Sequence, residues 1–212
     1  MNSTADDPRA TDVVRDHYDK SAARYDQQMS FFERVLFGGG RRWVCAQAQG
    51  DVLELAVGTG RNLRYYPAAI RLTGIELSPG MLELARREAA AVGSQADLRE
   101  GNAEALDFPA ESFDTVTCTL SLCTIPDDRA AVREAMRVLR PGGRFLLLEH
   151  VRSPLLPVRL AERLLEPLFL RLEHDHLTRE PLNHLRAEGF AVDVLERSKL
   201  GIVERVAAHK PA

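Results

Sequence analysis

The amino-acid sequence predicts an α/β protein in which helices cover both faces of a mostly parallel, doubly wound sheet. Two observations predict this class. After Gly50, short apolar runs bounded by turn residues alternate with longer segments of helical spacing. At the end of the chain, two strand-like runs follow one another across a short turn, so the last strand is expected to be antiparallel. A length of 212 residues suits one structural domain.

The segment before Gly50 has a helical pattern. Apolar and charged residues are mixed over residues 12–49 without strict alternation, and Gly38, Gly39 and Gly40 interrupt the pattern. We therefore expect residues 1–49 to form capping helices with a hinge or a turn at the glycines, ahead of a main unit over residues 50–212.

Strands and helices then alternate. Pro79 and Gly93 mark the two ends of one expected helix. The expected strands are 51–57, 71–77, 97–103, 112–122 and 144–151, and the expected helices between them are 79–93 and 127–139, the second closed by a turn at residues 140–143.

The C-terminal segment predicts one more helix and a strand pair. The helix is expected over residues 178–190, capped by Thr178 and ended by Gly189. Strands 191–197 and 201–209 follow. The total is a Rossmann-like sheet of seven strands with an antiparallel last strand.

Composition narrows the class of protein. Apolar residues make up 45% and charged residues 28% of the chain, and the net charge of -3 provides no positive field for nucleic acid. The first 30 residues carry acids and no continuous apolar run, and no stretch is apolar enough to span a membrane. The three cysteines lack metal-ligand spacing. We expect a cytoplasmic protein without a metal site.

The loop after the first strand, "VLELAVGTG" over residues 52–60, carries the first functional signal. Small residues at 56, 58 and 60 let the backbone approach a ligand. A dinucleotide loop would place glycine at position 61, where this chain has Arg61, and no Gly-Lys-Ser/Thr follows for a phosphate loop. A NAD-dependent oxidoreductase is therefore disfavoured.

The remaining pattern, E-x-(G/A)-x-G-x-G, resembles motif I of class I S-adenosylmethionine-dependent methyltransferases. Glu76 stands 22 residues after Glu54, at a strand end where a carboxylate can accept hydrogen bonds from both ribose hydroxyls. The segments "REGNAEALDFPAESFDTV" and "EAMRVLRPGGRFLLLEH" also resemble the family pattern, in which the residue after the third strand's glycine, here Asn102, meets the adenine. Ala56 departs from the usual glycine.

This resemblance implies a cofactor and a set of residues around it. The cofactor is S-adenosylmethionine, with S-adenosylhomocysteine as the product. The implied cofactor residues are Tyr18, Tyr25, Glu54, Ala56, Gly58, Gly60, Asn62, Glu76, Leu77, Met81, Asn102, Ala103, Thr119 and Leu120.

Two branches of the family are similar to this chain. The stretch "HYDKSAARYDQQM" resembles the opening helix of UbiE-type quinone C-methyltransferases and of bacterial phospholipid N-methyltransferases, in which this helix covers the cofactor. The stretch "CTLSLCTIPDDRAAVREAMRVLRPGGRFLLLEHVRSP", with the later "HLTRE", resembles the group that includes mammalian membrane-associated alkyl-thiol methyltransferases.

Residues 154–177 are the expected acceptor-site insertion. A leucine stripe recurs there every four residues, and three interpretations stay open: a helix packed on the sheet or on a partner, which we favour, a lid over an apolar acceptor, or a membrane-surface helix. The stripe comprises Leu156, Leu160, Leu164, Leu168 and Leu172, broadened by Leu165 and Phe169, with Arg159, Arg163 and Arg171 on the polar side.

Two histidines are candidates on the acceptor side. His150 ends the fifth strand, where an imidazole could act as general base, although a structural histidine is an equal alternative. His176 is a candidate of the acceptor pocket.

The sequence thus predicts methyl transfer to a small, largely apolar acceptor, with a thiol favoured. Alternatives are a phospholipid N-methyltransferase, a quinone C-methyltransferase and a regulatory domain that binds S-adenosylmethionine without turnover. The expected partners are a small-molecule acceptor and no nucleic acid, with peripheral membrane contact left open and a monomer or homodimer as the assembly.

Overall fold

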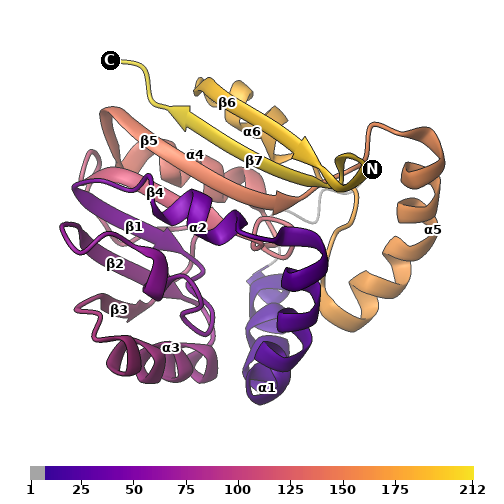
Figure 1. Cartoon of the computed structure of the whole chain (residues 1–212), viewed down its shortest axis with the longest axis horizontal. Coiled ribbons are helices and arrows are strands. Elements are labelled where there is room, and N and C mark those ends of the chain that lie inside the picture. The colour runs from indigo at the N-terminus through magenta and orange to yellow at the C-terminus, as the bar shows by residue number, and fades with distance from the viewer. Residues whose placement is uncertain (1–7) are drawn as a thin grey trace.

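A computed structural model describes residues 8–212, so the first seven residues of the predicted cap lie outside the described part. Seven strands form one sheet in the order β3-β2-β1-β4-β5-β7-β6 (Figure 1). The strands are β1 (Asp51–Leu55), β2 (Arg71–Glu76), β3 (Asp97–Glu100), β4 (Phe113–Thr119), β5 (Leu139–His150), β6 (Ala191–Ser198) and β7 (Val203–His209).

Strand direction fixes where the functional edge lies. The strands β1 to β5 pair in parallel, while β7 pairs antiparallel with both β5 and β6. The predicted antiparallel last strand is therefore confirmed. Because the parallel strands all end at one edge, the loops after β1, β2 and β4 meet there.

Helices surround this sheet. The N-terminal segment is one long helix that passes through a π-helical turn and the predicted glycine turn into a short helix. The helices are α1 (Pro8–Phe32), η2 (Glu33–Phe37), α2 (Gly40–Cys45), η3 (Leu63–Tyr65), α3 (Pro79–Val92), α4 (Asp128–Val138), α5 (Leu156–Glu173), α6 (Pro181–Ala187) and η4 (Lys199–Gly201).

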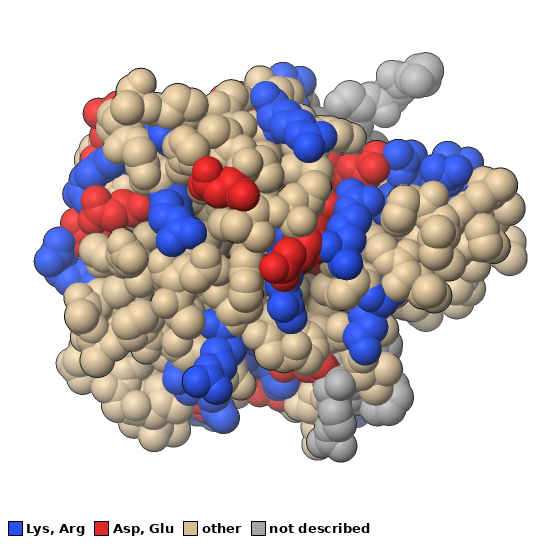
Figure 2. Space-filling view, turned by 45° about the horizontal axis from the view of Figure 1, so that its top comes forward, with Lys and Arg blue, Asp and Glu red and all other residues tan. Residues whose placement is uncertain are grey.

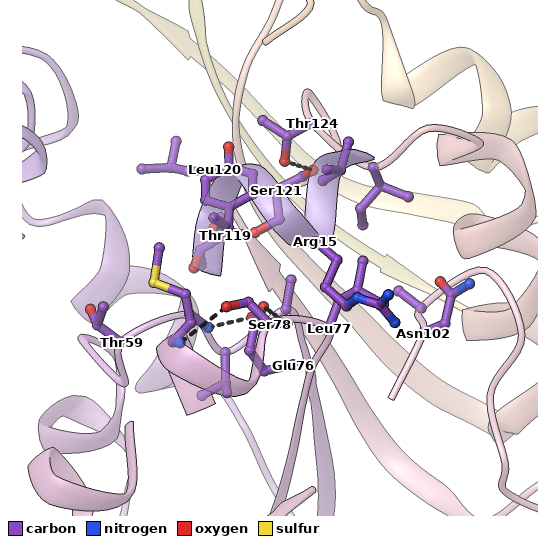
Figure 3. Close-up of a pocket in the computed structure, with 18 of the residues that line it drawn as sticks. Arg15, Thr59, Glu76, Leu77, Ser78, Asn102, Thr119, Leu120, Ser121 and Thr124 are labelled. Atoms are coloured by element: carbon purple, nitrogen blue, oxygen red, sulfur yellow. Dashed lines mark hydrogen bonds between the residues drawn. The ribbon is translucent and has the colours of Figure 1, made fainter. Parts of the chain in front are cut away.

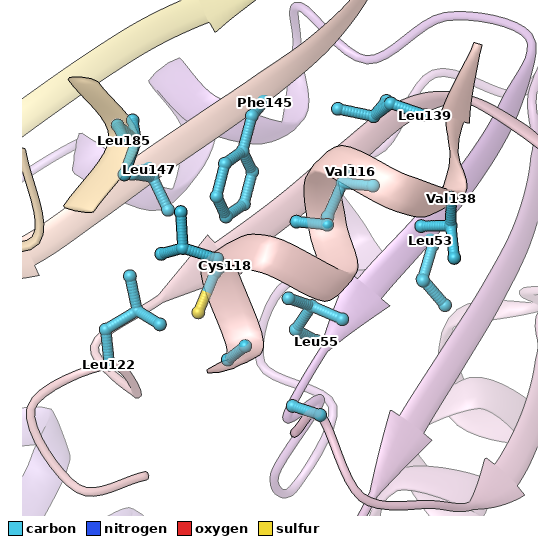
Figure 4. Packing of buried hydrophobic residues seen from close by; sticks show 14 of the residues in the cluster. Leu53, Leu55, Val116, Cys118, Leu122, Val138, Leu139, Phe145, Leu147 and Leu185 are labelled. Atoms are coloured by element: carbon cyan, nitrogen blue, oxygen red, sulfur yellow. The ribbon is translucent and has the colours of Figure 1, made fainter. Parts of the chain in front are cut away.

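Strand β5 shows why the sheet is covered on both faces. Phe145 and Leu147 pack in the cluster that includes residues of α4 and α6, such as Leu185 (Figure 4). The alternate residues, Leu146 and Leu148, pack in the cluster that includes Val44 of α2. Since successive side chains of a strand point to opposite faces, the uninterrupted apolar run of β5 requires helices on both sides.

Helix α3 begins and ends as its sequence predicts. Ser78 is the N-cap, and its Oγ accepts a hydrogen bond of 3.1 Å from the backbone N–H of Met81. Gly93 follows the helix with a φ of 69°, a left-handed conformation that favours glycine. The cap places the N-terminal turn of α3 beside the end of β2.

One local prediction is modified and another is wrong. Residues 140–143 lie within β5, which already starts at Leu139, but they have no partner on β4, because the pairing passes from Phe113–Leu139 to Thr115–Arg144. With Gly142 at a φ of 76°, the expected turn is an insertion within the strand. Thr178 does not cap α6, which begins at Pro181. Its Oγ1 instead donates a 2.8 Å hydrogen bond to Glu166 of α5.

One half of the favoured interpretation of the leucine stripe, a helix packed on the sheet, is also wrong, while packing on a partner stays a prediction. Helix α5 projects from the body of the molecule and does not pack on the sheet (Figure 1). Leu164 is 81% exposed, and the stripe's other leucines from Leu156 to Leu172 are exposed as well. None of the described helices is both long enough and apolar enough to span a membrane.

Candidate active site

A cleft of about 830 Å³ opens at the carboxyl ends of β1, β2 and β4, beneath α1 (Figure 3). The loops that diverge from these strands provide its floor and α1 provides its cover. Of the residues that the resemblance implies, the lining contains Tyr18, Tyr25, Ala56, Gly58, Glu76, Leu77, Met81, Asn102, Ala103, Thr119 and Leu120.

The loop after β1 brings its backbone to the cleft. Ala56 and Gly58 have φ angles of 51° and 59°, both in the left-handed region. A Cβ atom added to Gly58 would meet no protein atom within 4 Å, so the space beside this backbone is open. Ala56 adopts the turn conformation that glycine adopts more readily, at a cost of about 1 kcal/mol.

Glu76 lies at the centre of the wall. Its Oε2 accepts a 2.9 Å hydrogen bond from the N–H of Gly58, and its Oε1 accepts one of the same length from the N–H of Ser78 (Figure 3). Burial raises the pKa of this carboxyl above its usual value, while hydrogen bonds from the backbone N–H groups of Ser78, Gly58 and Leu77 oppose that shift. Each oxygen accepts one of the two 2.9 Å hydrogen bonds, and a carboxylate oxygen has a second lone pair for a further donor.

Three implied residues lie behind the wall instead of in it. Asn62 donates 2.7 Å and 2.9 Å hydrogen bonds to Oε1 of Glu54 and Oγ1 of Thr119. Gly60 packs against α3, where an added Cβ would lie 3.1 Å from Cα of Ala85. These residues shape the loop that faces the cleft.

Two arginines join the N-terminal helices to this loop. Arg41 donates hydrogen bonds of 3.0 Å to Asn62 and 2.9 Å to Thr119, and it also pairs with Glu33. Arg61 pairs with Glu33 and, at 3.1 Å, with Asp26. The residue that excludes a dinucleotide loop therefore ties the loop to α1.

The cover over the cleft is partly aromatic. Tyr18 and Tyr25 lie on α1 with ring centroids 6.1 Å apart, and both line the cleft. Burial raises the pKa of Tyr25 to about 12. Arg15 reaches from the same helix toward Asn102 (Figure 3). Spacing in the sequence does not reveal that Arg15 lines the cleft.

Neither candidate histidine lines the cleft. The Nδ1 atom of His150 is buried without a hydrogen-bond partner, and burial lowers the pKa of the imidazole below its usual value. The backbone N–H of His176 donates a 2.9 Å hydrogen bond to the carbonyl of Cys123. Burial, with a contribution from Arg179, lowers the pKa of His176 to about 4.

Glu149 organises the loop after β4. Its Oε1 accepts hydrogen bonds of 3.2 Å from the N–H groups of Ser121 and Leu122, and Ser121 lines the cleft. Burial raises the pKa of Glu149 to about 7 from a usual 4.5. The unfolded chain therefore releases this proton first, and stability falls as pH rises from 4.5 to 7.

Replacing Glu149 by Gln is expected to remove the loss of stability that accompanies this ionisation. The amide keeps an oxygen for the two N–H donors and does not ionise, so we expect the free energy of unfolding at pH 8 to rise by about 3 kcal/mol. At pH 4 the two proteins should be nearly equal. Denaturant unfolding at both pH values tests this, and an equal gain at both would contradict the ionisation.

Comparisons with known proteins agree with this geometry. Residues 53–147 match the family model described as a methyltransferase domain. Over 175 residues the chain is 33% identical to the ubiquinone/menaquinone biosynthesis C-methyltransferase UbiE of Geobacter sulfurreducens. The aligned region covers 75% of this chain and 65% of that protein.

Two further relatives act on other acceptors by name. A phosphatidylethanolamine N-methyltransferase of Cereibacter sphaeroides is 36% identical, over 55% of this chain and 58% of that protein. The human thiol S-methyltransferase TMT1A is 31% identical, over 61% of this chain and 54% of that protein. The chain thus spans less than two thirds of the length of these curated relatives.

A solved structure shows the same fold. The S-adenosylmethionine-dependent methyltransferase of Thermotoga maritima superposes with a TM-score of 0.70 at 21% identity, covering 93% of this chain and 99% of that one. The motifs, the fold and the relatives agree, and the chain belongs to the class I S-adenosylmethionine-dependent methyltransferases.

Proposed function

We propose that this chain transfers the methyl group of S-adenosylmethionine to a small, largely apolar acceptor, and that the preferred acceptor is a thiol. The observation that carries the proposal is the placement of Glu76. Its carboxylate lies in the cleft wall, held by two backbone N–H groups with acceptor capacity to spare. That arrangement suits the paired hydroxyls of a ribose.

The open space beside Gly58 supports the fit of the cofactor. A nucleoside and its methionine tail need a backbone cradle that no side chain fills, and the loop at residues 56–58 provides one. Asn102 and Ala103 would hold the adenine, and Glu76 the ribose. Tyr18 and Tyr25 would cover the methionine part.

The protein's contribution to the reaction is positional. The bound cofactor supplies an activated methyl group on its sulfonium, so the chain's residues need to orient the acceptor and exclude water. Leu120, Ile125 and Pro126 give the cleft an apolar side for such an acceptor. Tyr18 and Tyr25 of α1 line the same cleft.

The lining favours a thiol because it provides no poised base. Among the described lining residues, Glu76 is the one carboxylate, it is assigned to the ribose, and no histidine is present. A thiol of the cysteine type has a pKa of about 8.5, so a few per cent of it is already the nucleophilic thiolate at pH 7, whereas an alcohol would need a base. The name of the human thiol relative agrees with this preference.

Other acceptors remain the alternatives. The relatives named for a quinone and for a phospholipid support C- or N-methylation on the same scaffold. A regulatory domain that binds the cofactor without turnover is the alternative of another class.

A labelled methyl-transfer screen across thiols, phenols, amines and quinols separates these alternatives. We expect label on a small hydrophobic thiol. Label on a quinol or an amine instead would move the proposal to another branch. Tight binding of S-adenosylhomocysteine without transfer to any acceptor would favour the regulatory domain.

Replacing His150 by Ala should have a modest effect if the acceptor is a thiol. We expect turnover with the thiol to fall less than about tenfold, because a general base, which contributes roughly 100- to 10,000-fold where it is required, is not needed. The affinity for S-adenosylhomocysteine should stay within about threefold of the wild-type value. Rate measurements over pH 6–9 test this, and a larger loss confined to the rate would make His150 the base.

A further inference from the structure

Helix α5 separates its charges by face. Its three acidic residues lie on the side toward the body, where each one forms a hydrogen bond or an ion pair. Oε2 of Glu162 accepts a 3.0 Å hydrogen bond from the N–H of Ser153, Glu166 accepts one from Thr178, and Glu173 pairs with His17 at 3.6 Å. The inner face of the helix is therefore attached to the protein by its carboxylates.

The outer face of α5 is apolar and cationic. We define this face by its exposed leucines, which are Leu156, Leu160, Leu164, Leu165, Leu168 and Leu172. Arg163 and Arg171 are exposed on the same helix. Arg163 borders the leucines, and Arg171, seven residues after Leu164, lies among them near the C-terminal end. In Figure 2 the lobe in the position of α5 is mainly tan, with blue along its edge. A face of this composition is typical of helices that lie in a membrane interface.

A second element extends the outer face of α5. The turn between β6 and β7 presents Lys199 and Leu200, the latter 66% exposed. Oγ of Ser153, just before α5, donates a 2.7 Å hydrogen bond to the carbonyl of Leu200. Two separate parts of the chain therefore present the same combination of leucine and cation side by side.

We propose that the outer face of α5 and the β6–β7 turn dock on the surface of an anionic lipid membrane. The charge decides between this occupant and a second copy of the chain. Two copies meeting through this face would bring Arg163 and Arg171 against like charges, whereas anionic headgroups would neutralise them. Exposed leucines flanked by cations need an apolar layer below a negative surface, which a bilayer provides.

Docking would place the cleft close to the lipid. Helix α5 ends at Glu173, whose carbonyl oxygen lies 3.5 Å from the hydroxyl of Tyr18, a residue of the cleft lining. An apolar acceptor dissolved in the membrane would thus meet the cleft near the C-terminal end of α5. This last step rests on the proposed function, while the docking itself does not.

Vesicle sedimentation of the full chain tests the docking. We expect the protein to sediment with vesicles of phosphatidylcholine and phosphatidylglycerol, much less with phosphatidylcholine alone, and less as salt rises. The double variant Leu164→Ser/Leu168→Ser should bind about tenfold more weakly. The double variant Arg163→Gln/Arg171→Gln should lose about fivefold for each arginine.

The matched control is Leu195→Ser on β6. Leu195 is 42% exposed but lies outside the outer face of α5, so vesicle binding should not change. Thermal melts and S-adenosylhomocysteine affinity establish that each variant is folded, and they keep this test separate from that of methyl transfer. No sedimentation of the wild-type chain, equal binding by the leucine variant, or a dimer that this variant dissociates would overturn the proposal.

Discussion

Replacing Glu76 by Ala is expected to weaken the binding of S-adenosylhomocysteine about 30- to 1,000-fold, which corresponds to roughly 2–4 kcal/mol. The change removes the acceptor oxygens proposed for the ribose and also frees the N–H groups of Gly58 and Ser78. Isothermal titration calorimetry measures the loss directly. A change under threefold would contradict the ribose role.

Two control variants separate the ribose contact from other effects. Glu76→Gln keeps one acceptor oxygen and the volume of the side chain, so its loss should fall between those of the wild type and Glu76→Ala. Glu100 pairs with Glu76 in register at the end of the neighbouring strand β3, but it is exposed and lies outside the cleft. Glu100→Ala should leave the affinity unchanged, which excludes a general effect of removing charge at this sheet edge.

Replacing Gly58 by Asn is expected to weaken cofactor binding about 10- to 100-fold. Asparagine tolerates the left-handed backbone better than most residues, so the φ of 59° should survive, while the new side chain occupies the open cradle. Forcing a ligand against an added side chain costs about 1–3 kcal/mol, consistent with that loss. The affinity for S-adenosylhomocysteine is the measurement.

Gly93→Asn is the matched control for this substitution. Gly93 also has a positive φ, of 69°, and open space around its Cβ position, but it follows α3 away from the cleft. Any backbone cost should appear in both variants as reduced stability. If Gly93→Asn weakened binding as much as Gly58→Asn, strain and not the cradle would explain the loss.

The elements that the sequence predicts well are those whose conformation is determined by residues close to one another in the chain. Strand β1 and its loop, the cap and end of α3, and the apolar run of β5 depend on nearby residues, so spacing suffices to place them. The structure also explains two unusual residues in the loop after β1. Ala56 adopts the conformation expected of a glycine, and Arg61, which breaks the dinucleotide pattern, pairs with residues of the N-terminal helices.

The features that the sequence does not predict depend on contacts between distant segments. The hydrogen bonds of Arg41 to Asn62 and Thr119 join three elements, and no local spacing indicates them. The hydrogen bonds of Glu149 also join distant segments, because its partners at residues 121 and 122 follow another strand. A leucine stripe predicts an amphipathic helix but not what its apolar face contacts. The sequence therefore leaves open whether this face packs on the sheet or on a partner, and in the structure α5 lies off the sheet.

Transfer of a labelled methyl group from S-adenosylmethionine to a small hydrophobic thiol, by the wild-type chain beside Glu76→Ala and Glu100→Ala, tests the central claim most directly. We expect labelled thioether from the wild type and Glu100→Ala, and a much lower yield from Glu76→Ala at limiting cofactor. Equal yields from all three would contradict the cofactor site, and tighter binding of NAD than of S-adenosylhomocysteine would contradict the assigned cofactor.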